Sequence, residues 1–172
     1  MRSRWIAGAL ACGLLACAPT LDWRETSPQA SGIAALFPCR PDQHGRAVEL
    51  AETRVRMEML VCAAGGATYA LSFIDVADPT RVTPVLVAVR AVAAANLGAA
   101  QPRVAPWQIS GMTPNPQAAR VSFAGRLPDG AAVQQHSVFF SKGLRVYQAS
   151  VIGTKPPLDA VETFFTGLKF PS

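Results

Sequence analysis

The chain has 172 residues, with 16 Lys and Arg against 11 Asp and Glu, and half of its residues are hydrophobic. The formal net charge of +5 is spread along the sequence without a Lys/Arg cluster. A nucleic-acid-binding domain usually carries a concentrated basic stripe. The charge distribution therefore predicts no nucleic-acid partner.

The first seventeen residues, MRSRWIAGALACGLLAC, have the pattern of an export signal. Arg2 and Arg4 supply a positive start, and residues 5–16 form a mostly apolar run. This run is too short to span a bilayer, which needs about 20 residues. The run ends in LLAC at residues 14–17, which resembles the lipobox of bacterial lipoproteins.

The lipobox resemblance implies that residues 1–16 are a signal peptide and that the Cys17 sulfur receives a diacylglyceryl group. Cleavage before Cys17 frees its amino group, which can take a third acyl chain. Two or three acyl chains anchor a protein stably, whereas one gives only marginal binding. The residue after Cys17 is Ala18. In enteric bacteria an aspartate at this position retains a lipoprotein in the inner membrane. Ala18 therefore implies an outer-membrane lipoprotein whose domain faces the periplasm. The alternative is a plain signal peptide, or an uncleaved anchor, with Cys17 incidental.

Removal of residues 1–16 leaves 172 − 16 = 156 residues, a length suited to one domain. Without Arg2 and Arg4 the mature net charge is about +3. Residues 17–32 are rich in small polar residues and proline, so they are expected to form a flexible tether from the lipidated cysteine to a single domain at 33–172. Trp23 either rests at the membrane interface or docks on the domain.

Two cysteines remain outside the N-terminal segment, Cys39 and Cys62. In an oxidising periplasm they are expected to form a disulfide. The alternative is a metal site that also uses His44 and His136, but the paired spacings typical of such sites are missing. No metal or other cofactor is predicted.

Alternating hydrophobicity and turn residues predict strands at 46–51, 55–62, 67–75, 107–112, 118–127, 132–140 and 144–153. A helix is predicted over 85–98, beginning near Asp78-Pro79 or Thr83-Pro84 and ending at Gly98, and a second over 156–170. Short hairpins imply one antiparallel sheet of about six or seven strands, with both helices free to cover one face. The expected fold class is α+β.

The order of these elements resembles the PsbP-like superfamily. The resemblance is carried by FPCRP at 37–41, RVYQAS at 145–150 and AVETFFTGLKF at 160–170, and it covers most of 32–172. It implies this fold and a role in binding other proteins, but it matches no functional residue of the superfamily. A cystatin- or NTF2-like sheet with helices is the alternative fold.

The sequence contains no G-x-S-x-G, P-loop, H-E-x-x-H or G-x-G-x-x-G motif. His136 could act as a base, but the adjacent Ser137 points to the opposite face of a strand. With His136, three arginines form a possible binding face for anionic headgroups or an acidic partner: Arg120, Arg126 and Arg145. A plain solvated surface is the alternative.

The leading expectation is a lipid-anchored envelope protein that acts without catalysis, as an accessory or protein-binding module for an unidentified envelope protein. One alternative is a small periplasmic enzyme or ligand-binding domain with a cleft near His136. The other is a structural envelope lipoprotein without a specific ligand.

Overall fold

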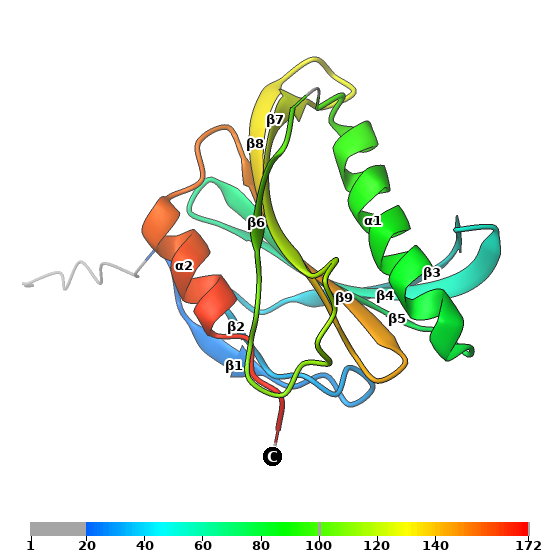
Figure 1. Ribbon diagram of the computed structural model, residues 1–172. Helices are drawn as coiled ribbons and strands as arrows, with labels where there is room; N and C mark the ends of the chain where they lie inside the picture. The colour runs from blue at the N-terminus through cyan, green and yellow to red at the C-terminus, as the bar shows by residue number, and fades with distance from the viewer. Residues whose placement is uncertain (1–19, 100, 172) are drawn as a thin grey trace, which may run out of the picture.

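A computed structural model describes residues 20–99 and 101–171, which build an α+β fold around a seven-stranded antiparallel sheet (Figure 1). The predicted signal peptide at 1–16 and Cys17 lie outside the described residues. The sheet order is β3-β4-β5-β9-β8-β7-β6. Its strands are β3 (Asp42–Leu50), β4 (Thr53–Ala64), β5 (Ala67–Asp75), β6 (Arg103–Pro106), β7 (Ala119–Arg126), β8 (Ala132–Lys142) and β9 (Arg145–Gly153).

The two α-helices of the described chain, α1 (Val82–Asn96) and α2 (Leu158–Thr166), lie on opposite faces of the sheet (Figure 1). The expectation that both cover one face is therefore wrong. The reason lies in the central strands, which are apolar on both faces. Phe139 and Phe140 are neighbours in β8 and both are 0% exposed. Since successive strand residues point to opposite faces, each face needs its own cover.

The predicted hairpin at 55–75 and the meander at 118–153 are confirmed as β4–β5 and β7–β8–β9. The strand predicted at 107–112 is wrong, because the edge strand β6 lies earlier in the chain. Residues 107–112 form no strand, and their larger side chains pack on the core instead: Trp107, Ile109 and Met112. Pro106 closes β6, a position that an edge strand tolerates.

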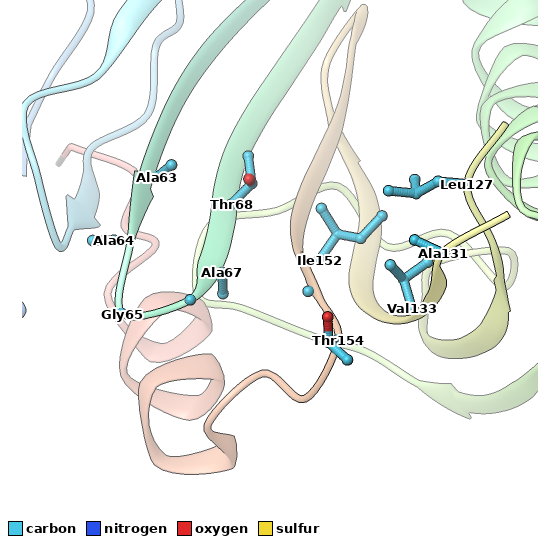
Figure 2. Close-up of a pocket in the computed structure, with 12 residues that line it drawn as sticks. Ala63, Ala64, Gly65, Ala67, Thr68, Leu127, Ala131, Val133, Ile152 and Thr154 are labelled. Carbon is cyan, nitrogen blue, oxygen red and sulfur yellow. The ribbon is translucent and has the colours of Figure 1, made fainter. Parts of the chain in front are cut away.

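Two tight turns differ in how visible they are in the sequence. Gly65 and Gly66 join β4 to β5 with φ of 58° and 75°, which glycine adopts easily (Figure 2). Ala51 and Glu52 join β3 to β4 with φ of 48° and 59°, although neither is a usual turn residue. Arg81 donates hydrogen bonds to the Ala51 carbonyl and to Thr53 Oγ1, which holds this turn in place. The strand predicted at 46–51 is β3, which begins four residues earlier, at Asp42, and ends at Leu50.

The described part of the expected tether belongs to the folded body, which corrects that expectation. β1 (Arg24–Thr26) pairs with β2 (Ala35–Phe37) in a two-stranded sheet. The Trp23 ring lies 6.0 Å from Tyr69, edge to face, so Trp23 docks on the domain. Further along, the buried Tyr147 hydroxyl donates a 2.7 Å hydrogen bond to the Ser31 carbonyl. Contacts of this kind fix residues 20–32 against the α2 side of the sheet.

The turn that leads into α1 and the end of α1 follow local capping chemistry. Asp78 accepts a 2.8 Å hydrogen bond from the Thr80 amide and caps a 3₁₀ turn (Pro79–Arg81) that leads into α1. The Thr80 hydroxyl also donates a 2.7 Å hydrogen bond to Asp78, and this bond together with the amide bond lowers the pKa of Asp78. Gly98, with φ of 57°, follows the end of α1, as predicted. α2 is shorter than the predicted 156–170, since it ends before Gly167.

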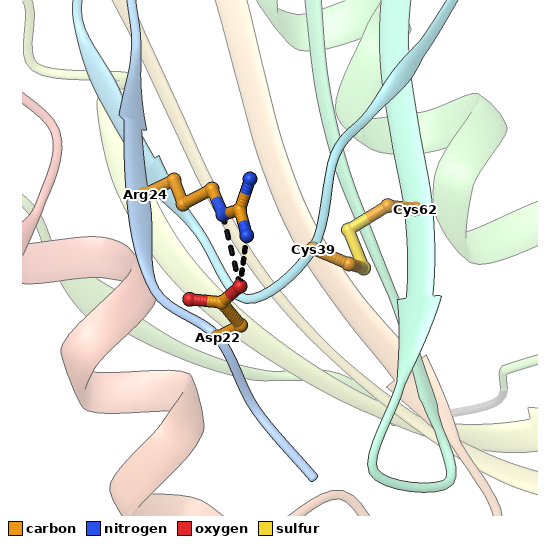
Figure 3. The surroundings of a disulfide bond; sticks show 4 residues. All are labelled: Asp22, Arg24, Cys39 and Cys62. Atoms are coloured by element: carbon orange, nitrogen blue, oxygen red, sulfur yellow. Dashed lines mark hydrogen bonds and ion pairs between the residues drawn. A yellow bond between two sulfur atoms is a disulfide. The ribbon is translucent and has the colours of Figure 1, made fainter. Parts of the chain in front are cut away.

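The predicted disulfide is present between Cys39 and Cys62, with Cα atoms 6.0 Å apart (Figure 3). It joins the segment after β2 to β4, so it fastens the small sheet to the large one. Beside it, Asp22 and Arg24 form an exposed ion pair (Figure 3).

Loss of this disulfide is expected to destabilise the domain. It closes a loop of 23 residues in sequence separation, and the chain-entropy model gives about 3 kcal/mol for such a loop. Cys62→Ala should therefore lower the free energy of unfolding by about that amount in urea denaturation. Reduction should weaken the wild type similarly and leave Cys62→Ala unchanged. Equal stability of wild type and variant without reductant would contradict a stabilising bridge.

Candidate functional site

The strand register assembles a row of polar residues across the β6 edge of the sheet. Ser122 of β7 lies opposite His136 of β8, and Arg103 of β6 lies opposite Ser122. Directly opposite residues in an antiparallel pair lie on the same face, so all three side chains belong to the α2 side. They line a pocket of about 460 Å³, together with the exposed side chains of Gln101 and Gln134.

A hydrogen bond of 3.0 Å joins Ser122 Oγ to His136 Nδ1. The other ring nitrogen, Nε2, is buried and has no hydrogen-bond partner among the described residues. Desolvation lowers the pKa of His136 below its ordinary 6.5, and the nearby Arg120 charge lowers it further, while Glu162 opposes both. The histidine is therefore held neutral near pH 7, with one donor and one acceptor nitrogen.

The four sequence-predicted site residues do not form one open basic face. Arg120 is paired with Glu162 of α2 through both carboxylate oxygens and lies over the Phe165 ring, 5.3 Å from its centroid. This pairing lowers the pKa of Glu162. The structure brings Arg120 near His136, but the Arg120 charge is already matched by the helix.

The other two arginines lie apart from this pocket. Arg145 pairs with Asp75 at 2.5 and 2.9 Å at the far end of β9. Arg126 donates a 2.8 Å hydrogen bond to the Gly130 carbonyl in the β7–β8 turn. Each of these side chains fastens a strand end or a turn, so neither belongs to a shared site with His136.

No sequence pattern marks Arg103, Gln101 or Gln134 as site residues, and the serine that meets His136 is not the adjacent Ser137. Ser137, next to His136, faces α1 and accepts a 2.8 Å hydrogen bond from Gln135. Ser122 is fourteen positions away and becomes a partner through the β7–β8 register. The predicted turn at 128–130 indicates that the two flanking strands pair. Which residues lie opposite each other also depends on the exact length of the loop between the strands, and the sequence does not define that length.

The chemistry of the pocket is that of a polar binding site. A serine bound to a neutral histidine resembles part of a hydrolase triad, in which an acidic third group orients the histidine. Here the nearest candidate, Glu162, is occupied by Arg120. Arg103 is exposed at the rim, and no acidic side chain in the described parts of the chain forms an ion pair with it.

A second, more apolar hollow of about 660 Å³ lies on the opposite face of the sheet (Figure 2). It occupies the end of the sheet where the β4–β5 turn, the end of β9 and the β7–β8 turn meet. No charged side chain lines it. Its side-chain lining includes Ala63, Thr68, Leu127, Ala131, Val133 and Ile152.

No protein-family model matches the chain, and no curated protein matches it. Across residues 20–99 and 101–171, no helix is long and apolar enough to cross a membrane. In the same residues, no three His, Cys, Asp or Glu side chains are grouped so that they could hold a metal ion.

Acidification should weaken the fold through His136. Because its folded pKa lies below the unfolded value, the unfolded chain binds more protons as pH falls below about 6.5. The contribution of His136 to the free energy of unfolding is therefore fully present above pH 6.5 and declines at lower pH. His136→Gln should flatten the stability profile between pH 7 and 5, measured by urea denaturation at each pH. Retention of the wild-type slope in the variant would refute the assignment.

Proposed function

We propose that the chain is a bacterial envelope lipoprotein, anchored through Cys17 after removal of residues 1–16, whose domain binds an extended segment of another envelope protein without catalysis. The lipobox-like LLAC at 14–17 supports the anchor. A disulfide between Cys39 and Cys62 fits an oxidising compartment such as the periplasm. The resemblance to PsbP-like proteins supports a binding role by analogy of fold alone.

The exposed edge strand β6 carries this proposal. All four residues of β6 are exposed, and its only neighbour in the sheet order is β7. An exposed edge presents unpaired backbone groups to which a further strand can add. Val104, which is 58% exposed, offers an apolar contact beside them.

The opposite edge strand, β3, is less suited to such pairing. Charged side chains recur along it, among them Asp42, Arg46 and Glu49. Charges on an edge strand are a common protection against strand addition. β6 has a single charged residue, Arg103, and that side chain lines the His136 pocket.

These features define the chemistry of the partner. Alternate residues of an added strand point to opposite faces, so one face would meet Arg103 and the other Val104. We therefore expect an extended segment in which an acidic side chain pairs with Arg103 and an adjacent apolar side chain contacts Val104. Gln101, Gln134 and His136 would supply hydrogen bonds around the acidic group.

A photo-crosslinking amino acid at Val104 in intact cells is expected to yield one reproducible protein adduct. The same amino acid at Ala47, an exposed position on β3, is the matched control and should not yield it. Arg103→Glu should reduce the adduct about tenfold, the effect of losing roughly 1.4 kcal/mol of charge pairing. Cys17→Ser should release the protein from the membrane fraction. Equal adducts at both positions, or adducts only with lipid and bulk porins, would refute the binding edge.

The hydrogen bond between Ser122 and His136 favours a hydrolytic enzyme as the second candidate. In a screen of ester, amide and glycoside substrates, we expect the wild type, Ser122→Ala and His136→Gln to show the same background rate. Hydrolysis by the wild type that both variants lose would establish the enzyme in place of the non-catalytic module. Ser150→Ala, in the neighbouring strand, serves as the control for a serine outside the pocket.

A further inference from the structure

The apolar hollow at the β4–β5 turn lies beside the point where the described chain begins. Leu21 packs on the turn, because a Cβ atom added to Gly65 would lie 2.9 Å from Leu21 Cδ2 and 4.0 Å from Thr20 Cγ2. Gly65 and Gly66 are themselves part of the hollow's lining. The start of the described chain and the rim of the hollow therefore share the same turn.

This placement is fixed by contacts further along the segment. The Asp22 amide donates a 2.8 Å hydrogen bond to the Pro38 carbonyl, and the Trp23 ring packs against Tyr69 of β5. The position of Thr20 is thus set by the body of the domain. Figure 3 shows this segment running toward the tip of the β4–β5 hairpin.

Only Ala18 and Pro19 separate Thr20 from Cys17. Three Cα–Cα steps of about 3.8 Å place the Cys17 Cα at most about 11 Å from that of Thr20. Leu21 packs on the α2 side of the β4–β5 turn, whereas the apolar side chains of the hollow lie on the other face of the sheet. An acyl group on the Cys17 sulfur is therefore tethered near the rim of the hollow and would enter it around the tip of the β4–β5 hairpin. Such a short tether gives an effective concentration in the millimolar range, with no need for an affinity that would capture a free lipid.

We propose that this hollow shelters one acyl chain of the lipid carried by Cys17 when the protein is outside a bilayer. The inference rests on the proposed lipidation of Cys17. The lining suits a hydrocarbon chain, because it is uncharged and contributes the side chains of Leu127, Val133 and Ile152. A volume of about 660 Å³ lies within the range of small-molecule pockets.

The hollow stabilises the acyl chain only while the protein is in water. Inside a bilayer the acyl chain is already in hydrocarbon, so the hollow offers it no advantage. In water each CH₂ group that the hollow covers recovers free energy, since burial of such groups drives membrane anchoring itself. The hollow therefore lowers the free-energy cost of leaving the membrane, because it stabilises the protein in water and leaves the membrane-bound state unchanged.

The test uses full-length protein from cells fed a diazirine-bearing fatty acid. Mass spectrometry of the N-terminal peptide first shows whether Cys17 carries the labelled lipid. The protein is then diluted below the critical micelle concentration of its detergent, irradiated, and mapped by peptide sequencing. A mixture with isotope-labelled protein separates crosslinks within one chain from those between chains. We expect crosslinks within one chain, to peptides spanning residues 63–68 and 127–133.

Ala63→Trp and Ala131→Trp each place a large side chain at an exposed alanine of the lining and should reduce this crosslink about tenfold. That factor corresponds to losing the cover of roughly two CH₂ groups. Ala47→Trp, at an exposed alanine on β3, is the control and should leave the yield unchanged. Two blocking variants keep the test valid if one misfolds.

The outcomes separate the two proposals. An N-terminal peptide without lipid would overturn the lipoprotein assignment, and the shelter with it. A lipidated Cys17 whose crosslinks fall only between chains, or are insensitive to both tryptophan variants, would overturn the shelter and leave the anchor intact.

Discussion

The main constraint on this structure is a sheet with two apolar faces and little helix to cover them. Seven strands spaced about 4.8 Å apart span roughly 29 Å. At 1.5 Å per residue, the 15 residues of α1 extend about 22 Å and the 9 residues of α2 about 13 Å. The α2 side recruits β1 and β2 as additional cover, locked by the disulfide. Both candidate sites lie where these covers end: the His136 pocket at the β6 edge, and the apolar hollow beyond α1.

Two ion pairs connect elements of this arrangement but contribute little to its free energy of folding. Arg120 connects the sheet to α2 through Glu162, and Arg145 connects β9 to β5 through Asp75. Exposed pairs of this kind contribute about 0–1 kcal/mol each. Their larger effect is to occupy the charges that sequence reasoning had assigned to a binding face. This leaves Arg103 as the charged residue in the lining of the His136 pocket, which is the reason for proposing an acidic group as its ligand.

Sequence patterns predicted the structure correctly where it depends on the chemistry of the residues at that position. Gly65 and Gly66 marked the β4–β5 turn, and Cys39 and Cys62 marked the disulfide. The same patterns failed where the local structure depends on residues far away in the sequence. Ala51 and Glu52 adopt a left-handed turn because Arg81, about thirty positions later, binds it. Ser122 meets His136 because of strand register, which one sequence does not specify. Short hairpins predict an antiparallel sheet, but they do not show that both of its faces are apolar, as the adjacent buried residues Phe139 and Phe140 of β8 require.

The two sites are back to back, and this connects the proposed anchor to the proposed binding edge. Val133 and Gln134 are neighbours in β8, so their side chains point to opposite faces of the sheet. Val133 lines the apolar hollow, whereas Gln134 lines the His136 pocket. The end of the sheet next to the proposed lipid is thus also the end that carries the binding pocket. With only two residues between Cys17 and Thr20, a lipid on Cys17 would keep this end close to the bilayer. The partner segment would then have to lie at the membrane surface, which favours a membrane-bound partner over one diffusing freely in the periplasm.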